Sequence, residues 1–280
     1  MFGVVVNYFS NKSFPLKIKQ SAKFALSLLL NCEDVSSVVL SDGSNEPDEE
    51  MKNYCESLMI KYVHQGKKTN FGESFNYGVS FLEEEWIALM NSDIYVYPDT
   101  FLQFHRFIER HSNLNIGCLI PYLAKSDFPL QANSIRRNAY ASLMTYNLNI
   151  FKKEVLARIG GVSTDFSGCF NDVDACIKLK RLGLDVYIVG HAYALHYGRL
   201  TIDTCGQEFL DDEKVFLSKY PQLYDKNGFW YLKTDKFLRS GFLKLLFYLV
   251  RCFSSKLSNC WNDRLYNSLF MLVPYFQKIK

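Results

Sequence analysis

The chain has 280 residues, 48% hydrophobic and 22% charged, a composition typical of a folded globular protein and unlike that of a disordered chain. Fifteen glycines and seven prolines are too few for a collagen-like or low-complexity sequence. The net charge of +3 is unevenly distributed, because residues 233–280 carry nine Lys or Arg and two Asp, which leaves the first 232 residues with a net charge of −4.

The eight cysteines form no C-x-x-C pair and show no paired zinc spacing. Free thiols in a reducing cytosol fit this pattern best, although an even number of cysteines is also compatible with disulfides. We find no secretory leader. The longest apolar run within residues 233–280 covers residues 245–250. It is far shorter than the roughly 20 residues that span a bilayer. The sequence therefore predicts a cytoplasmic protein that is not an integral membrane protein.

Short apolar runs alternate with segments of helical length near the N-terminus. The expected strands cover residues 3–6, 35–40, 58–63 and 86–90, and the expected helices cover residues 17–31, 46–57 and 72–84. This alternation predicts an α/β fold, with a doubly wound, mostly parallel sheet that binds its ligand at the carboxyl ends of the strands.

The pattern is looser after residue 93. We expect helices at residues 98–111, 172–182 and 207–219, strands at 116–123, 185–189 and 192–196, and a long loop at 125–138. Because no repeat or Gly/Ser linker precedes residue 220, residues 1–220 are predicted to form one domain and residues 221–280 a helical appendage.

The second expected strand ends in Ser41-Asp42-Gly43-Ser44. An Asp-Gly pair often does no more than end a strand in a turn. Alternatively, the Asp42 carboxylate lies at the carboxyl edge of the sheet and accepts a hydrogen bond from the imide N–H of uracil or thymine.

The helix expected after the third strand begins with small or amide residues at every second position, namely Asn70, Gly72, Ser74, Asn76 and Gly78. Such a surface lets a diphosphate or nucleoside approach backbone N–H groups and the positive end of the helix dipole. The alternative is an Asn-capped helix that happens to be rich in glycine. The chain has neither a P-loop here nor a G-x-G-x-x-G motif after the first strand, which disfavours hydride-transfer enzymes.

Two strands end in potential metal ligands. The fourth expected strand runs into Asn91-Ser92-Asp93, and the strand at 192–196 ends in His196. One carboxylate at a sheet edge can hold Mg²⁺ or Mn²⁺ against a diphosphate, and a neutral imidazole can add a further ligand. Alternatively, Asp93 only terminates its strand and His196 is structural.

Asp172 and Asp174 lie in the first turn of an expected helix, where the helix dipole favours a charged carboxylate. Either of two explanations fits. Asn171 or Asp172 caps the helix, or a carboxylate here acts as a general base toward a hydroxyl group.

Together, the order and spacing of these motifs resemble those of family 2 glycosyltransferases, which are inverting enzymes of the GT-A fold that use nucleotide-diphosphate sugars. The subgroup that the chain is most similar to builds bacterial cell-surface polysaccharide, as rhamnosyl- and galactofuranosyltransferases do. The resemblance covers roughly residues 3–200 and rests on Val4–Tyr8, Ser41–Ser44, Asn70–Gly78, Asn91–Asp93 with Pro98-Asp99, Gly160-Gly161, Asn171–Asp174 and His196.

The resemblance implies a role for each motif. Asp42 would contact the nucleobase, while Asn70, Gly72 and Asn76 would line the nucleotide site. Asp93 and His196 would bind the divalent metal, Mn²⁺ or Mg²⁺, and Asp172 would be the catalytic base. On the acceptor side we expect Asp174, Arg136 and Arg137, the two arginines meeting a lipid phosphate.

The chain departs from the family pattern at two positions. Asn91 and Ser92 precede a single acid at the metal motif, and Asn171 stands where the family usually has a first acid beside the base. These changes leave a catalytically impaired, sugar-nucleotide-binding homologue as an alternative.

The expected chemistry is a direct displacement, in which one base on the acceptor side suffices and a metal stabilises the departing diphosphate. A hydrolytic glycosidase would need two opposed carboxyl groups instead. A nucleotidyltransferase is a weaker alternative, because residues 7–14 contain no Gly or Arg. Nucleic-acid binding is not expected, since the basic residues cluster among apolar tail residues.

In residues 241–255, Lys244, Tyr248, Arg251 and Ser255 form a narrow basic stripe on a mostly apolar helix. Such a helix suits the surface of an anionic membrane, where a lipid-linked or glycan acceptor would wait at the inner face of the cell membrane. Alternatively, the tail packs on the domain or on a second subunit. The sequence leaves the sugar, the acceptor, the oligomeric state and the choice between UDP and dTDP open.

Overall fold

The computed structural model describes residues 1–10, 16–124, 138–141, 144–198, 211–221, 224–225 and 228–229. Its strands are β1 Phe2–Tyr8, β2 Val35–Asp42, β3 Lys61–His64, β4 Trp86–Asn91, β5 Ile94–Val96, β6 Ile116–Leu123, β7 Ala139–Ala141, β8 Leu148–Lys152, β9 Asp185–His196, β10 Tyr224–Asp225 and β11 Gly228–Phe229. Its helices are α1 Leu16–Leu29, α2 Glu49–Ser57, α3 Phe71–Val79, α4 Thr100–Arg110, α6 Lys153–Arg158, α7 Asn171–Arg181 and α9 Asp212–Lys219.

The main sheet has the strand order β3-β2-β1-β4-β8-β6-β9-β5, and β7 pairs with β9 off this path. The first four strands are parallel, with β1 between β2 and β4. β8 reverses the direction, because it is antiparallel to both β4 and β6. The carboxyl ends of β1, β2, β4 and β6 therefore meet at one edge of the sheet, as expected for an α/β ligand site.

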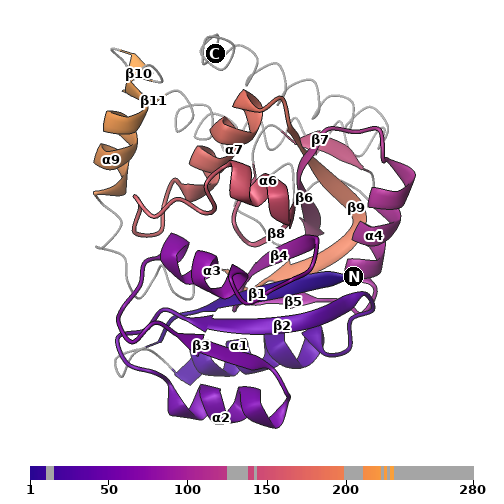
Figure 1. The fold of residues 1–280 in the computed structure, drawn as a ribbon, viewed down its shortest axis with the longest axis vertical. Coiled ribbons are helices and arrows are strands. Elements are labelled where there is room, and N and C mark those ends of the chain that lie inside the picture. Colours follow the sequence, from indigo (N-terminus) through magenta and orange to yellow (C-terminus); the bar gives the residue numbers. More distant parts are fainter. Residues whose placement is uncertain are drawn as a thin grey trace, which may run out of the picture.

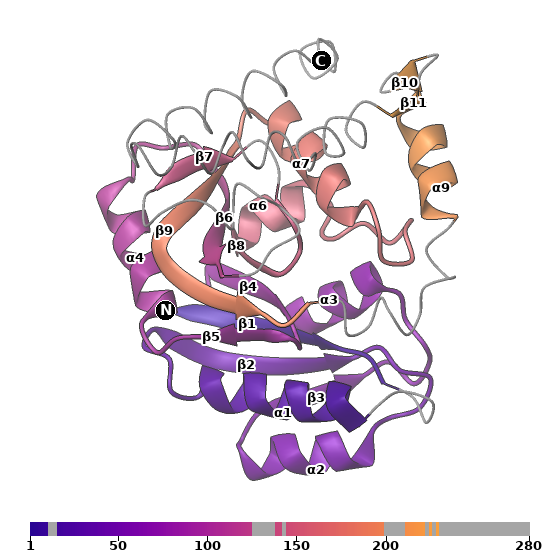
Figure 2. The same ribbon diagram turned by 180° about the vertical axis from the view of Figure 1, so that it is seen from behind.

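β9 is the longest strand, and its pairing changes along its length. It is parallel to β6 along residues 185–189 and again at Tyr193 and Ala194, and its last three residues are also antiparallel to β5. The register with β6 jumps from Val189 to Tyr193, so residues 190–192 bulge out of the ladder. A bulge bends a strand, and Figure 2 shows β9 curving from β6 across the sheet toward β5.

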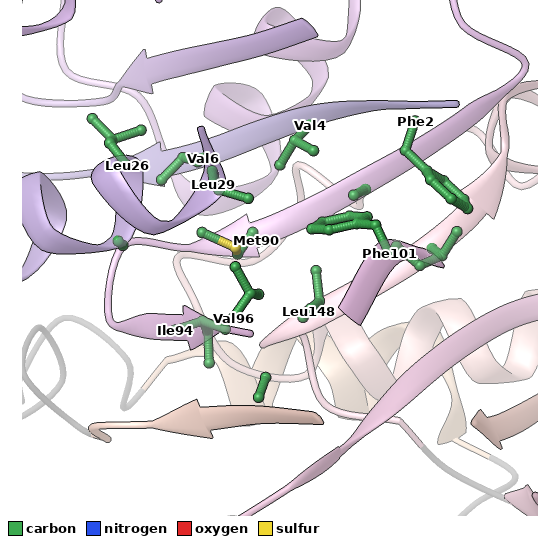
Figure 3. Packing of buried hydrophobic residues seen from close by; sticks show 14 of the residues in the cluster. Phe2, Val4, Val6, Leu26, Leu29, Met90, Ile94, Val96, Phe101 and Leu148 are labelled. Carbon is green, nitrogen blue, oxygen red and sulfur yellow. The ribbon is translucent and has the colours of Figure 1, made fainter. Parts of the chain in front are cut away.

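Helices cover both faces of the sheet (Figure 1). The apolar side chains of β1 alternate between these faces, because Val4 and Val6 pack with α1 and α4 whereas Val5 packs with Phe75 of α3. Figure 3 shows the first of these two cores, in which Leu26 and Leu29 of α1 and Phe101 of α4 lie against β1 and β4. On the opposite face, α3 lies so close to β1 that a Cβ on Gly78 would be 2.4 Å from Cγ1 of Val5.

The predicted α/β fold with helices on both faces is confirmed, and so are the strands and helices expected in the first 93 residues. The bounds differ by three residues or more at three places. The second helix begins at Glu49 rather than at residue 46. The third strand begins at Lys61 rather than at residue 58, because Met59 takes a left-handed conformation with φ +57° after α2. The third helix ends at Val79, five residues earlier than expected.

Five strands and a helix lie where the sequence analysis expected none, namely β5, β7, β8, β10, β11 and α6. β10 and β11 pair with each other near the start of residues 221–280, where a helical appendage was expected. β8 is buried on both faces of the sheet and has only five residues. A short apolar run of this kind carries little periodicity, so only its neighbours β4 and β6 identify it as a strand.

The five cysteines that the structure describes are free, as expected. Within the same part of the chain, no helix is long and apolar enough to cross a bilayer. Residues 125–137 of the loop expected at 125–138, the start of the helix expected at 207 and the tail helix at 241–255 lie outside the described residues.

Candidate active site

The structure brings together the two residues that the sequence analysis expected to bind a metal. Asp93 follows β4 in the turn to β5, and the antiparallel register pairs Ile94 with His196 at the end of β9. Nε2 of His196 lies 3.4 Å from Oδ2 of Asp93, and the two side chains are only 11% and 13% exposed. The backbone N–H of Tyr197 also donates to the carbonyl oxygen of Asp93, at 2.9 Å.

This pair fits a divalent cation that is shared with a phosphorylated ligand. An octahedral cation with bonds of about 2.1 Å places neighbouring ligand atoms roughly 3.0 Å apart, close to the 3.4 Å seen here. No third His, Cys, Asp or Glu joins the pair among the residues that the structure describes. Two protein ligands suit Mg²⁺ or Mn²⁺, which commonly take their remaining ligands from water and substrate phosphates.

Asn91 precedes this pair and links it to β8. Its side-chain amide nitrogen donates to the carbonyl oxygen of Tyr146 at 2.7 Å. Its backbone N–H donates to the carbonyl oxygen of Asn147 at 2.9 Å. At the position where the family motif usually has an acid, this chain therefore has an amide that bonds to the neighbouring backbone. Its buried Oδ1 has no hydrogen-bond partner in the described part of the chain.

Asp172 lies at the start of α7, where its Oδ1 accepts the N–H of Val173 at 2.8 Å. The side chain keeps some contact with solvent although protein surrounds it on most sides. Burial disfavours the charged carboxylate and raises the pKa of Asp172 to about 6. A carboxylate that titrates near neutral pH is suited to act as a general base.

Tyr146 is buried in the same apolar core as Ala175 and Cys176 of α7. Its carbonyl oxygen holds Asn91. Burial raises the pKa of its hydroxyl well above the usual range, and the nearby Asp172 carboxylate contributes in the same direction. The backbone of Tyr146 therefore contacts the end of β4 while its side chain packs in the core beside α7, and this residue was not predicted from the sequence.

Asp174 is placed in the protein interior and not on a surface that an acceptor could reach. Its side chain is 1% exposed. Oδ1 accepts the hydroxyl of Tyr220 at 2.7 Å and lies 2.8 Å from Nζ of Lys219, while Oδ2 lies 2.8 Å from Nζ of Lys178. This set of partners gives Asp174 a structural role, which corrects the expectation that it faces the acceptor.

Asn70 and Asn76, expected to line the nucleotide site, use their amides to hold backbone in residues 160–164. Asn76 accepts the N–H of Val162 at 2.9 Å and donates to its carbonyl oxygen at 2.8 Å. Asn70 caps α3 in a capping box with Glu73 and donates to the carbonyl oxygen of Thr164 at 2.8 Å. Both side-chain amides are therefore bonded to protein backbone rather than directed at a ligand.

Gly72 belongs to the same contact. A Cβ at this position would lie 2.1 Å from the carbonyl oxygen of Ser163, so only glycine allows α3 to approach this backbone so closely. Gly161 takes a left-handed conformation with φ +72° beside Asn76. Asn70, Gly72 and Asn76 thus join the helix to the segment that leads into α7, whereas Ser74 and Gly78 contact β2 and β1.

Asp42 is fully buried at the end of β2, and both of its carboxylate oxygens are occupied. Oδ1 accepts the N–H of Ser44 at 2.9 Å. Oδ2 accepts the hydroxyl of Tyr62 at 2.5 Å and the N–H of Asp48 at 3.2 Å. Asp42 therefore shapes the loop after β2, and the sequence analysis missed its partner Tyr62, whose only signal was its place at the end of the neighbouring strand.

Arg136 and Arg137 lie outside the described residues. Three further residues were not predicted from the sequence. Asp212 and Phe216 of α9 contact the loop before α7, and Tyr220, which follows α9, contacts Asp174 in the first turn of α7. The sequence predicted only a helix at residues 207–219 here, and no local motif marks these three positions.

Comparison with solved structures supports a shared fold. The mannosyltransferase PcManGT from Pyrobaculum calidifontis, in complex with GDP-Man and Mn²⁺, is 12% identical, with a TM-score of 0.55 over 99% of this chain and 84% of that one. TarS from S. aureus is 14% identical, with a TM-score of 0.53 over 76% of this chain and 41% of that one. GalNAc-T7 with UDP, GalNAc and Mn²⁺ is 12% identical, with a TM-score of 0.52 over 70% of this chain and 42% of that one.

The chain thus spans about two fifths of the TarS and GalNAc-T7 chains. These likenesses identify the mixed, curved sheet with its helices as the GT-A fold. A search of curated proteins finds no match. Residues 18–171, more than half of the chain, match the model of glycosyl transferase family 2. The chain therefore belongs to glycosyl transferase family 2.

Proposed function

We propose that the protein is an inverting glycosyltransferase that moves a sugar from a nucleotide-diphosphate donor to a hydroxyl group of a glycan or lipid-linked acceptor. UDP- and dTDP-sugars are the proposed donors, and synthesis of cell-surface polysaccharide is the proposed role. The observation that carries the proposal is the Asp93–His196 pair, 3.4 Å apart at the carboxyl edge of the sheet.

In the proposed reaction, Asp172 accepts the proton of the acceptor hydroxyl as the oxygen forms a bond to the anomeric carbon. The bond from this carbon to the donor diphosphate breaks on the opposite face, which inverts the configuration. Asp93 and His196 would hold Mn²⁺ or Mg²⁺, which when bound stabilises the departing diphosphate as a Lewis acid. A pKa of about 6 leaves Asp172 mostly deprotonated, and ready to accept a proton, at neutral pH.

Binding of donor nucleotides tests the proposal. We would titrate wild type and Asp93→Ala with UDP, dTDP and GDP, with and without Mn²⁺, by calorimetry and thermal shift. Stabilisation by one nucleotide that depends on Mn²⁺ and is lost in Asp93→Ala is expected. Glu83→Ala, at a largely exposed position outside the sheet edge, is a matched acid-to-alanine control that should behave as wild type. Failure of all three nucleotides to bind would contradict the proposal.

A sugar-nucleotide-binding protein without catalysis is the second candidate, favoured by Asn91 and Asn171 at positions where the family usually has acids. Asn171 is buried and donates to the carbonyl oxygen of Ser163 at 2.7 Å. The two candidates differ in turnover: the enzyme transfers sugar or slowly hydrolyses its donor and loses this activity in Asp172→Asn. The binding protein neither transfers sugar nor hydrolyses a donor, and Asp172→Asn leaves its nucleotide binding unchanged.

We further propose that the basic tail, residues 221–280, holds the protein at the anionic inner face of the cell membrane. Sedimentation with vesicles of anionic lipid tests this for the full chain. Wild type should sediment with the vesicles, and the double variant Lys244→Glu with Arg251→Glu should not, because it reverses the charge of the stripe. Equal binding of both proteins would favour the alternative, in which the tail packs on the domain or on a second subunit.

A further inference from the structure

Helix α9 lies beside the loop that leads into α7 (Figures 1 and 2). Asp212, at its start, accepts three consecutive backbone N–H groups of this loop, from Ser167 at 2.7 Å, Gly168 at 2.9 Å and Cys169 at 2.8 Å. The side chain of Asp212 is almost completely buried. Three N–H groups that converge on one point form a site for an anion, and here the protein supplies the anion itself.

The next residue of the loop is held in an unfavourable conformation. Phe170 has φ +64° and ψ −4°, in the left-handed region that residues with a Cβ seldom adopt. Its ring stacks on Phe216 of α9, with ring centroids 4.9 Å apart and an angle of 24° between the planes. Strain of this kind persists only where surrounding contacts enforce it, and the stacking on α9 is such a contact.

The far end of α9 holds the first turn of α7. Lys219 and the following Tyr220 both contact Oδ1 of Asp174, at 2.8 Å and 2.7 Å. The helix therefore contacts the chain on both sides of Asp172, at residues 167–170 before it and at Asp174 after it. None of these contacts involves the carboxylate of Asp172, so α9 leaves it available to accept a proton.

We propose that α9 positions the candidate base and that Asp212 is the positioning residue on which this depends. The inference rests on the proposed function, because it assigns Asp172 as the base. Asp212 fixes the loop from which α7 starts, and the direction of the Asp172 side chain follows from that start. In the alternative, α9 adds only to the overall stability of the protein.

Asp212→Asn in the full-length chain tests the proposal, because the amide can no longer accept all three N–H groups. Asp211→Asn is the matched control, since the neighbouring Asp211 is 80% exposed and pairs only outward with Lys214. Tyr220→Phe removes one hydroxyl bond to Asp174 and serves as a milder variant should Asp212→Asn fail to fold. The measurements are kcat, KM for the donor, the pH profile of kcat and hydrogen exchange of residues 163–174.

We expect kcat to fall at least tenfold in Asp212→Asn, because small displacements of a catalytic group are costly. KM and the binding of UDP with Mn²⁺ should change less than about twofold, since the donor site is untouched. The acidic limb of the pH profile should move, and hydrogen exchange should accelerate within residues 163–174. Tyr220→Phe should show the same changes more weakly, and Asp211→Asn should behave as wild type.

A lower melting temperature with unchanged kcat and pH profile would overturn the proposal, because stability alone would then explain α9. Failure of the proposed function gives a different result. Wild type would then neither transfer sugar nor hydrolyse any donor, and hydrogen exchange would decide whether Asp212 anchors the loop. Exchange of residues 163–174 as slow in Asp212→Asn as in wild type would refute the anchoring.

Discussion

Replacing Asp172 by Asn is expected to stabilise the protein at neutral pH while it removes the candidate base. Burial raises the pKa of Asp172 to about 6 in the folded chain, whereas an Asp in an unfolded chain titrates near ~3.9. The folded state therefore binds this proton more tightly than the unfolded state does. The contribution of Asp172 to stability is greatest below pH ~4 and is lost as the pH rises through about 6.

The size of the effect follows from this shift. About two pKa units at ~1.36 kcal/mol each set an upper limit of about 3 kcal/mol. Since the side chain keeps some contact with solvent, we expect about 1–2 kcal/mol at pH 8. Asn retains the oxygen that accepts the N–H of Val173 at 2.8 Å, so the substitution removes the charge without opening a cavity.

Urea unfolding of wild type and Asp172→Asn at pH 4.5 and pH 8 measures this effect. The free energy of unfolding of the variant should exceed that of wild type at pH 8, and the gap should shrink at pH 4.5. Asp211→Asn, at an exposed position, should show no such gain. A gap of equal size at both pH values, or a variant less stable than wild type at pH 8, would contradict a raised pKa of Asp172 in the folded chain.

Three further predictions concern the same site. Gly72→Ala should lower the free energy of unfolding by about 1–3 kcal/mol in urea melts, because its Cβ would collide with the carbonyl oxygen of Ser163; an unchanged stability would mean that α3 moves away without cost. The kcat of wild type should fall about tenfold per pH unit below about 6, as Asp172 becomes protonated, and a flat profile between pH 5 and 8 would exclude it as the base. His196→Ala should weaken nucleotide binding at least about tenfold in the presence of Mn²⁺ and much less in its absence. Equal losses under both conditions would show that His196 is not a metal ligand.

Local patterns in the sequence were sufficient to predict the first half of the fold. β1, β2 and β4 contain short apolar runs, the run at 58–63 overlaps β3, and the helices between them have apolar residues at helical spacing, so each element carries its own signal. Parallel strands joined by helices place their carboxyl ends at one edge of the sheet. The position of Asp93 at that edge followed from this rule before any contact was known.

The second half of the sheet could not be predicted in the same way. β8 is a short strand buried on both faces, and it reverses the direction of the sheet between β4 and β6. The bulge in β9 at residues 190–192 bends the strand, and its end lies between β6 on one side and β5 on the other. That bend brings His196 to Asp93, and it depends on pairing between distant strands, which no local pattern encodes.

The amino-acid sequence predicts which chemical groups lie at the ends of the strands and at the start of α7. What these groups contact depends on how the elements pack in three dimensions. The amides of Asn70 and Asn76 hold backbone near Val162 because α3 packs against that segment. Asp174 is enclosed by Lys178, Lys219 and Tyr220 because α9 returns to α7. A polar side chain is specified locally, but its partner is set by packing between distant segments, and that packing is a property of the whole fold.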